Sequence, residues 1–107
     1  MDLSNLLELA AQKICGTTTK LTGDLNNYKT AGVFRTGQAS ETSALMNCPV
    51  TGGAIVLIVF NPYGIGNLTS GSFQLILTFA TIGTGIFYRT QSGGEWLGWK
   101  VVNMTAV

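Results

Sequence analysis

The chain has 107 residues and a formal net charge of +1, with 46% hydrophobic and 10% charged residues. Its length suits a single domain, and its near-neutral charge argues against a partner attracted by a strong field, such as nucleic acid or anionic lipid. Because soluble domains commonly carry about 25% charged residues, this composition indicates that other copies of the chain cover part of the apolar surface.

The N-terminal segment has the composition of a helix. Over residues 2–15, Asp2 is placed to cap the first turn and Gly16 to end the last one. The apolar positions of one stripe are Leu3, Leu7, Ala10 and Ile14. This stripe fits either packing on its own domain or a short parallel seam between copies. We expect a helical neck or attachment segment over 1–22 and a β domain over 23–107.

From Gly23 onward the sequence is rich in Gly, Thr, aliphatic and aromatic residues, which favours strands separated by turns. The predicted strands are 32–36, 53–60, 72–80, 84–91 and 95–102, with a short strand at 44–47 also considered. The stretch 35–43 is polar and is predicted to be a surface loop. A long loop is predicted at 61–71, and the turns at 82–85 and 92–94 predict an antiparallel meander for the last three strands. We therefore expect a mostly β, sandwich-like domain.

Alternation within the predicted strands separates two faces. We assign Phe73, Leu75, Leu77 and Phe79 to the core, and Gln74, Ile76 and Thr78 to the opposite face. The run AIVLIVF at 54–60 does not alternate, so this strand is predicted to be covered on both faces. A single domain of about five strands cannot readily supply a packing layer on both faces of this strand. The second layer is most simply supplied by another copy of the chain.

The two tryptophans of the chain lie three positions apart, in GEWLGWK. In a regular strand Trp96 and Trp99 point to opposite faces. Trp99 would then be a core residue with Leu97 and Val101. Trp96 would lie at the surface or a subunit seam with Gly98, Lys100 and Val102. A β-bulge at Gly98 is the alternative, and it would put both rings on one side.

Little in the sequence points to membrane insertion, secretion or metal binding. The longest apolar run, 54–60, falls far short of the roughly 20 residues that a spanning helix needs. The N-terminus does not resemble a signal peptide, so we expect synthesis in the cytoplasm, with Cys15 and Cys48 as free thiols. Two cysteines without any histidine make poor zinc ligands.

Catalysis is also disfavoured. Without histidine the chain cannot build a Ser-His-Asp or Cys-His arrangement. A pair of acids drawn from Asp24, Glu41 and Glu95 is disfavoured as a glycosidase site. We expect no enzyme activity and no cofactor.

The basic residues are spread singly, which argues against single-stranded nucleic acid as a ligand. Arg89 and Lys100, on adjacent predicted strands, can flank Trp96 and form a site for an anionic ligand. Tyr63, in the long loop, is a further exposed aromatic. The candidate ligand-binding residues are Trp96, Tyr63, Arg89 and Lys100.

Several short motifs occur in a fixed order along the β region. They are Asp24-Leu25-Asn26, Tyr28, Gly32-Val33-Phe34, Asn47-Cys48-Pro49, Gly52-Gly53, Gln74, Tyr88-Arg89-Thr90 and Trp96-Leu97-Gly98-Trp99. This order resembles the pyocin-knob type domain of phage tail fibres and phage-derived bacteriocin fibres. The resemblance covers about residues 23 to 102 and leaves out the N-terminal segment.

The resemblance implies a homotrimeric module of a virion tail fibre or contractile bacteriocin, which contacts other tail proteins and attaches to the host surface. A host surface glycan is the implied ligand, although some members of this family act as spacers. The alternative is a monomeric carbohydrate-binding module associated with a cell-wall hydrolase, which would bind through Trp96 and Tyr63.

Overall fold

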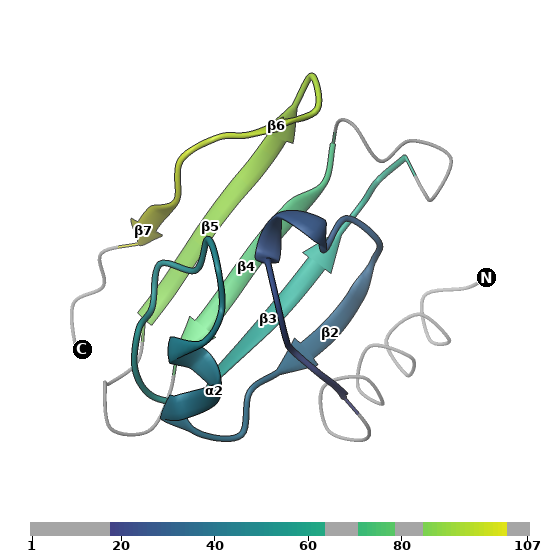
Figure 1. Cartoon of the computed structure of the whole chain (residues 1–107). Coiled ribbons are helices and arrows are strands. Elements are labelled where there is room, and N and C mark those ends of the chain that lie inside the picture. Colours follow the sequence, from purple (N-terminus) through teal and green to yellow (C-terminus); the bar gives the residue numbers. More distant parts are fainter. Residues whose placement is uncertain (1–17, 64–70, 79–84, 103–107) are drawn as a thin grey trace, which may run out of the picture.

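The computed structural model describes residues 18–63, 71–78 and 85–102 (Figure 1). The predicted helix at 2–15 and Cys15 lie outside these residues. In the described part, Cys48 is a free thiol, and partial burial raises its pKa. No helix of this part is long and apolar enough to cross a membrane. The division of the chain at residue 22 stays a prediction.

Seven strands form one sheet, which confirms the prediction of a mostly β fold. They are β1 (Thr19–Lys20), β2 (Gly32–Arg35), β3 (Ile55–Phe60), β4 (Phe73–Thr78), β5 (Gly85–Ser92), β6 (Glu95–Trp96) and β7 (Lys100–Val102). The order is β1-β2-β3-β4-β5-β6, with β7 also pairing with β5. All neighbours are antiparallel except β1 and β2.

Two predictions between β2 and β3 are wrong. The polar stretch 35–43 contains α2 (Ala39–Ser43), which is too short to show a helical repeat. The short strand considered at 44–47 is a single backbone bridge between Met46 and Asp24, next to the 3-10 helix η1 (Leu25–Asn27). Local hydrogen bonds such as that from the Gly37 N–H to Glu41 hold α2 together with tertiary contacts, among them the ion pair between Lys20 and Glu41. The bridge to Asp24 depends on a segment distant in sequence, which local sequence does not reveal.

The hydrophobic core lies on one face of the sheet, which we call the covered face. Its buried residues are Leu21, Leu25, Val50, Ile55, Leu57, Val59 and Ile76. Both η1 and α2 lie over this face in Figure 1. Leu21, just after β1, belongs to this core, and β1 itself pairs with β2 at the edge of the sheet.

The core face of β4 is the reverse of the predicted one. Gln74, Ile76 and Thr78 are buried, whereas Phe73 and Leu75 are only partly buried. The alternation was correct and the choice of side was wrong, because hydrogen bonds allow Gln74 to be buried. Its amide nitrogen donates to two backbone carbonyls in the η1 region, and its carbonyl accepts from Arg89.

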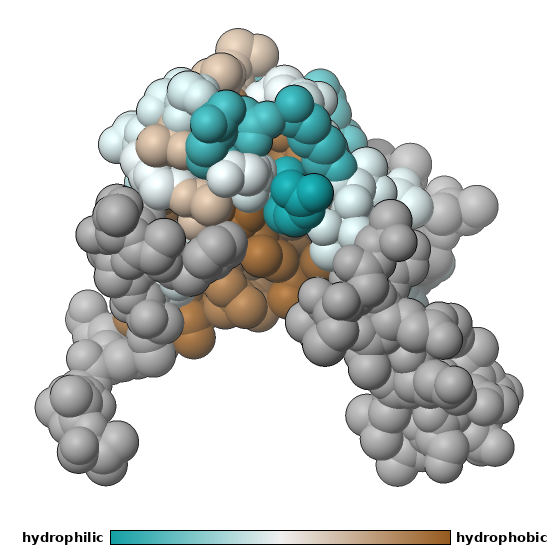
Figure 2. Space-filling view, turned by 90° about the horizontal axis from the view of Figure 1, so that it is seen from below, coloured by the Kyte–Doolittle hydropathy of each residue, from teal (hydrophilic) through white to brown (hydrophobic). Residues whose placement is uncertain are grey.

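The opposite side of the sheet is what we call the open face. Its apolar residues are Val33, Val56, Ile58, Phe60, Phe73, Leu75, Leu77, Ile86, Tyr88 and Val102. Phe73 stacks on Tyr88 with ring centroids 5.8 Å apart, and it contacts Phe60 at 6.1 Å. Figure 2 shows hydrophobic residues on the side of the domain away from its hydrophilic residues. The described residues therefore cover one side of β3, and the predicted second cover is not among them.

Candidate functional site

The most distinctive side-chain cluster is a cation held between two aromatic rings. The guanidinium carbon of Arg89, on β5, lies 4.4 Å from the ring centroid of Trp96 and 4.5 Å from that of Trp99. Arg89 is only 5% exposed. Burial lowers the pKa of Arg89 to about 10, so the side chain is still charged at neutral pH. A desolvated cation over an indole ring is stabilised by about 2 kcal/mol.

Both tryptophans lie on the same side of the chain, so the prediction of opposite faces is wrong. The strand expected at 95–102 ends at Trp96 and resumes only at Lys100. This break ends the alternation between the two rings. Leu97, within the break, is 52% exposed, and Val101, on β7, is 54% exposed, although both were expected in the core. Trp99 does pack against the core, as predicted.

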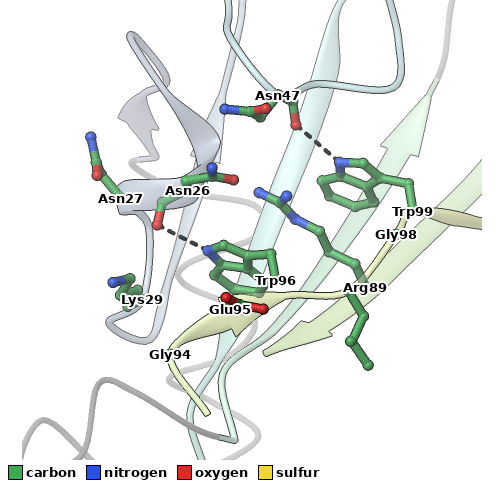
Figure 3. A pocket seen from close by; sticks show the side chains of 11 residues that line it. Asn26, Asn27, Lys29, Asn47, Arg89, Gly94, Glu95, Trp96, Gly98 and Trp99 are labelled. Atoms are coloured by element: carbon green, nitrogen blue, oxygen red, sulfur yellow. Dashed lines mark hydrogen bonds between the residues drawn. The ribbon is translucent and has the colours of Figure 1, made fainter. Parts of the chain in front are cut away.

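Each indole is fixed by a hydrogen bond to a distant loop. Trp96 Nε1 donates to the carbonyl oxygen of Asn26 at 3.0 Å, and Trp99 Nε1 donates to that of Asn47 at 2.9 Å (Figure 3). These bonds join the C-terminal strands to η1 and to the segment that precedes β3. The two tryptophans of the Trp-x-x-Trp motif therefore connect the C-terminal part of the sheet to two loops that lie over the covered face.

Asp24 links the two loops that receive these bonds. Its carboxylate accepts from the backbone N–H of Asn26 and from the side-chain amide of Asn47, both at 2.8 Å. The bond from Asn47, then that from Asn26 and the charge of Arg89, lower the pKa of Asp24 below its usual value. Asn47 has a positive φ of 58°, a conformation that asparagine tolerates better than most residues.

An open pocket of about 510 Å³ adjoins this cluster (Figure 3). The aromatic and cationic cluster lines it on the side of β5. Exposed or partly buried polar residues line the rim. The lining residues are Asn26, Asn27, Lys29, Asn47, Arg89, Gly94, Glu95, Trp96, Leu97, Gly98 and Trp99. Indole rings beside amide and charged groups are suited to a polar ligand with an apolar face, such as a saccharide.

Four buried polar side-chain atoms have no hydrogen-bond partner within the described ranges. They are Asn26 Oδ1, Arg89 Nη2, and Gln91 Nε2 and Oε1. All three residues adjoin Trp96, through a backbone hydrogen bond, a stacking contact and a β5–β6 pair respectively. Each such group costs about 1–3 kcal/mol, so native proteins contain few of them. Because these unpartnered atoms all lie around Trp96, this part of the fold is the strongest candidate for a ligand-binding site among the described residues.

The structure brings together two of the four candidate ligand residues. Trp96 and Arg89 are in contact, and both line the pocket. Lys100 pairs with Tyr88, the neighbour of Arg89 on β5, and is absent from the pocket lining, so it does not flank Trp96 with Arg89. Tyr63 follows β3, is 65% exposed and is also absent from the lining.

Sequence reasoning missed Asn26 and Asn47, which line the pocket, and the buried Gln91, which pairs with Trp96. Asn26 and Asn47 appeared only as members of the fibre-like motifs, and Gln91 carried no signal. The described residues contain no group of three or more His, Cys, Asp or Glu side chains that could hold a metal ion.

Comparison with known proteins gives a likeness of fold. No protein-family model matches the chain, and no curated protein matches it. The chain is similar to the solved P. aeruginosa R1 pyocin fibre comprising C-terminal residues 323–701, with a TM-score of 0.59 and 22% identity over 85% of this chain. For the R2 pyocin fibre comprising residues 323–691, the TM-score is 0.60 and the identity 19%, again over 85% of this chain.

The chain spans about a quarter of those fibre chains, 24% of the first and 25% of the second. At these identities the comparison establishes fold alone. The chain has a β-rich fold similar to part of these pyocin fibres.

Proposed function

We propose that this chain is a non-catalytic structural and adhesive module of a phage or phage-like tail fibre, related to the pyocin-knob type domains. It assembles as a homotrimer through the open face and contributes to attachment at the host surface. It works in the virion tail or a phage-derived bacteriocin, next to other tail proteins. The apolar open face supports the proposed assembly, and the likeness of fold to the pyocin fibres supports the fibre context.

The open face has the chemistry of a buried interface. Its centre is a row formed by Ile58, Leu75 and Tyr88, which are cross-strand neighbours on β3, β4 and β5. Ten of its residues are apolar, and Phe60 at its margin is 49% exposed. The charged residues that the register places on this face are Arg35, opposite Val56, and Lys100, opposite Tyr88, on strands away from its centre. A sheet normally buries an apolar face against another layer, and burial contributes about 25 cal/mol for each Å² removed from water.

A second and a third copy of the chain are the covers we propose. The net charge of +1 makes repulsion between identical copies small. In a three-fold ring each interface joins two different patches of the chain, so a broad apolar face turned toward the axis can meet both neighbours with its two halves.

Sedimentation analysis of the purified chain tests the assembly. We expect a trimer for the wild type and a monomer for Leu75→Lys, which places a charge at the centre of the open face. Ser40→Lys on α2, exposed on the other side of the domain, is the matched control and should stay trimeric. A wild-type monomer at micromolar concentration would overturn the trimer.

A cell-adsorption assay tests host attachment. The purified domain should bind host cells and compete with the phage, with three weak sites on one rigid head acting together. A host surface glycan is the ligand we propose. A trimeric domain that neither binds cells nor blocks adsorption would be a spacer rather than an adhesin.

The second candidate function is a monomeric carbohydrate-binding module associated with a cell-wall hydrolase. The pocket beside Trp96 favours it, whereas the separation of Tyr63 from that pocket removes one of the two aromatics on which it depended. Polysaccharide binding by a monomer, abolished by Trp96→Ala, would support this alternative.

A further inference from the structure

We propose that the unpartnered polar atoms around Trp96 bind the hydroxyl groups of an uncharged saccharide, with the Trp96 indole as cover and stacking surface. The atoms are Arg89 Nη2, the side-chain amide of Gln91 and Asn26 Oδ1. This inference rests on the proposed adhesive function and gives it a ligand class.

The three residues offer complementary hydrogen-bonding groups. Arg89 Nη2 donates, Asn26 Oδ1 accepts, and the amide of Gln91 does both. A sugar hydroxyl both donates and accepts, so neighbouring hydroxyl groups can satisfy this set. An indole supplies the flat apolar surface against which the C–H face of a sugar ring packs.

Charge favours a neutral ligand over an acidic one. The charge of Asp24 acts on Arg89, so the guanidinium already has a compensating carboxylate nearby. At the rim, Lys29 and Glu95 carry opposite charges. The charges of Lys29, Arg89, Glu95 and Asp24 around the site sum to zero, so no excess positive charge favours the anionic ligand that the sequence indicated.

Two buried glutamines on the covered face show why a purely structural role does not explain the cluster. Gln74 is fully buried, and its amide makes three hydrogen bonds, to Leu25, Tyr28 and Arg89. Gln91 is 4% exposed, yet neither of its amide atoms has a partner in the described part of the chain. The amide of Gln74 stabilises the fold, whereas that of Gln91 costs stability.

A ligand reaches these atoms when the indole of Trp96 moves. Its only hydrogen bond is the one from Nε1 to Asn26, and β6 is two residues long. Outside it lies the open pocket. Rotation of the indole exposes the polar atoms to the pocket, and the ring then lies against the sugar.

Intrinsic fluorescence reports on this site alone, because both tryptophans of the chain line the pocket. The probes are glucose, galactose, rhamnose and N-acetylglucosamine, with glucuronate as the acidic comparison. We expect a saturable change in tryptophan emission with at least one neutral sugar, and weaker binding of glucuronate. Emission that no neutral sugar changes, or tighter binding of glucuronate, would overturn the proposal.

Substitutions separate binding from stability. Gln91→Met and Asn26→Ala should each weaken binding of the responding sugar by about fivefold, the loss of one or two neutral hydrogen bonds. Both should keep or raise the unfolding midpoint, because they remove unpartnered groups. Gln74→Met, the matched control, should lower it. If Gln91→Met lowers the midpoint as much as Gln74→Met does, the amide is structural and the proposal fails.

The oligomeric state distinguishes this failure from failure of the proposed function. A trimer that binds host cells without responding to any sugar overturns the saccharide site alone. A monomer whose emission responds to a sugar overturns the trimeric fibre module and keeps the site.

Discussion

In a sheet with one face in water, the buried face is usually apolar and the other face polar. Here the covered face includes buried polar side chains, and the open face is largely apolar. The covered face holds a polar cluster of Gln74, Arg89 and Gln91 beside its aliphatic core. The open face presents side chains such as Leu75 and Tyr88 with no covering layer in the described ranges. The apolar character of the open face indicates that another layer covers it in the assembled protein. On the covered face, the polar side chains of Gln74, Arg89 and Gln91 form a defined cluster beside the aliphatic core.

The largest expected effect compares one leucine on each face. Leu57→Ala, in the core, should lower the free energy of unfolding by about 3 kcal/mol. For Leu75→Ala, on the open face, we expect a smaller loss in a monomer and a loss that depends on protein concentration in a trimer. Chemical denaturation at two protein concentrations checks this. Equal losses independent of concentration would contradict the distinction between the faces.

Arg89→Ala tests the polar cluster of the covered face. It removes a buried cation from between two rings and leaves the carbonyl of Gln74 without its donor. We expect the free energy of unfolding to fall by about 3 kcal/mol. Denaturant unfolding followed by circular dichroism measures it. Arg89→Lys keeps the charge but not the planar group, so it should recover only part of the loss.

A smaller effect should follow from Trp99→Phe. Phenylalanine keeps an aromatic ring beside Arg89 but cannot donate to the carbonyl of Asn47. The expected loss is about 1 kcal/mol, the usual contribution of one hydrogen bond. Thermal unfolding provides the measurement, and an unchanged midpoint would mean that the bond is not needed to hold the 46–48 segment.

The smallest effect concerns pH. The pKa of Asp24 is lower in the folded chain than in the unfolded one, mainly through its hydrogen bond from Asn47. Its stabilising contribution is therefore present above the unfolded pKa, about 4, and is lost as the pH falls through the folded pKa. Unfolding midpoints of the wild type and Asp24→Asn, measured between neutral pH and pH about 3, should converge at low pH. A constant difference would exclude this linkage.

Local sequence predicted β2, β3, β4 and β5 well, because each depends on features within a few residues. The β-branched run that became β3, and the glycine-containing sequences on either side of β5 that predict turns, mark the positions of these strands without reference to the rest of the chain. The cation between the rings was not predictable, because it depends on a break in the strand after Trp96. Of the candidate site, sequence identified Trp96 and Arg89 and missed the amides around them.

The sequence by itself determined the β class, the positions of most strands and the alternation along β4. Only the tertiary structure decided which side of that alternation is buried. Alternation is symmetric with respect to the two faces, and the choice depends on segments that are distant in sequence. Gln74 is buried because the carbonyls of Leu25 and Tyr28, 49 and 46 residues away, accept its amide hydrogens. The polar side of β4 therefore became its inner side, and the apolar side was left for a partner.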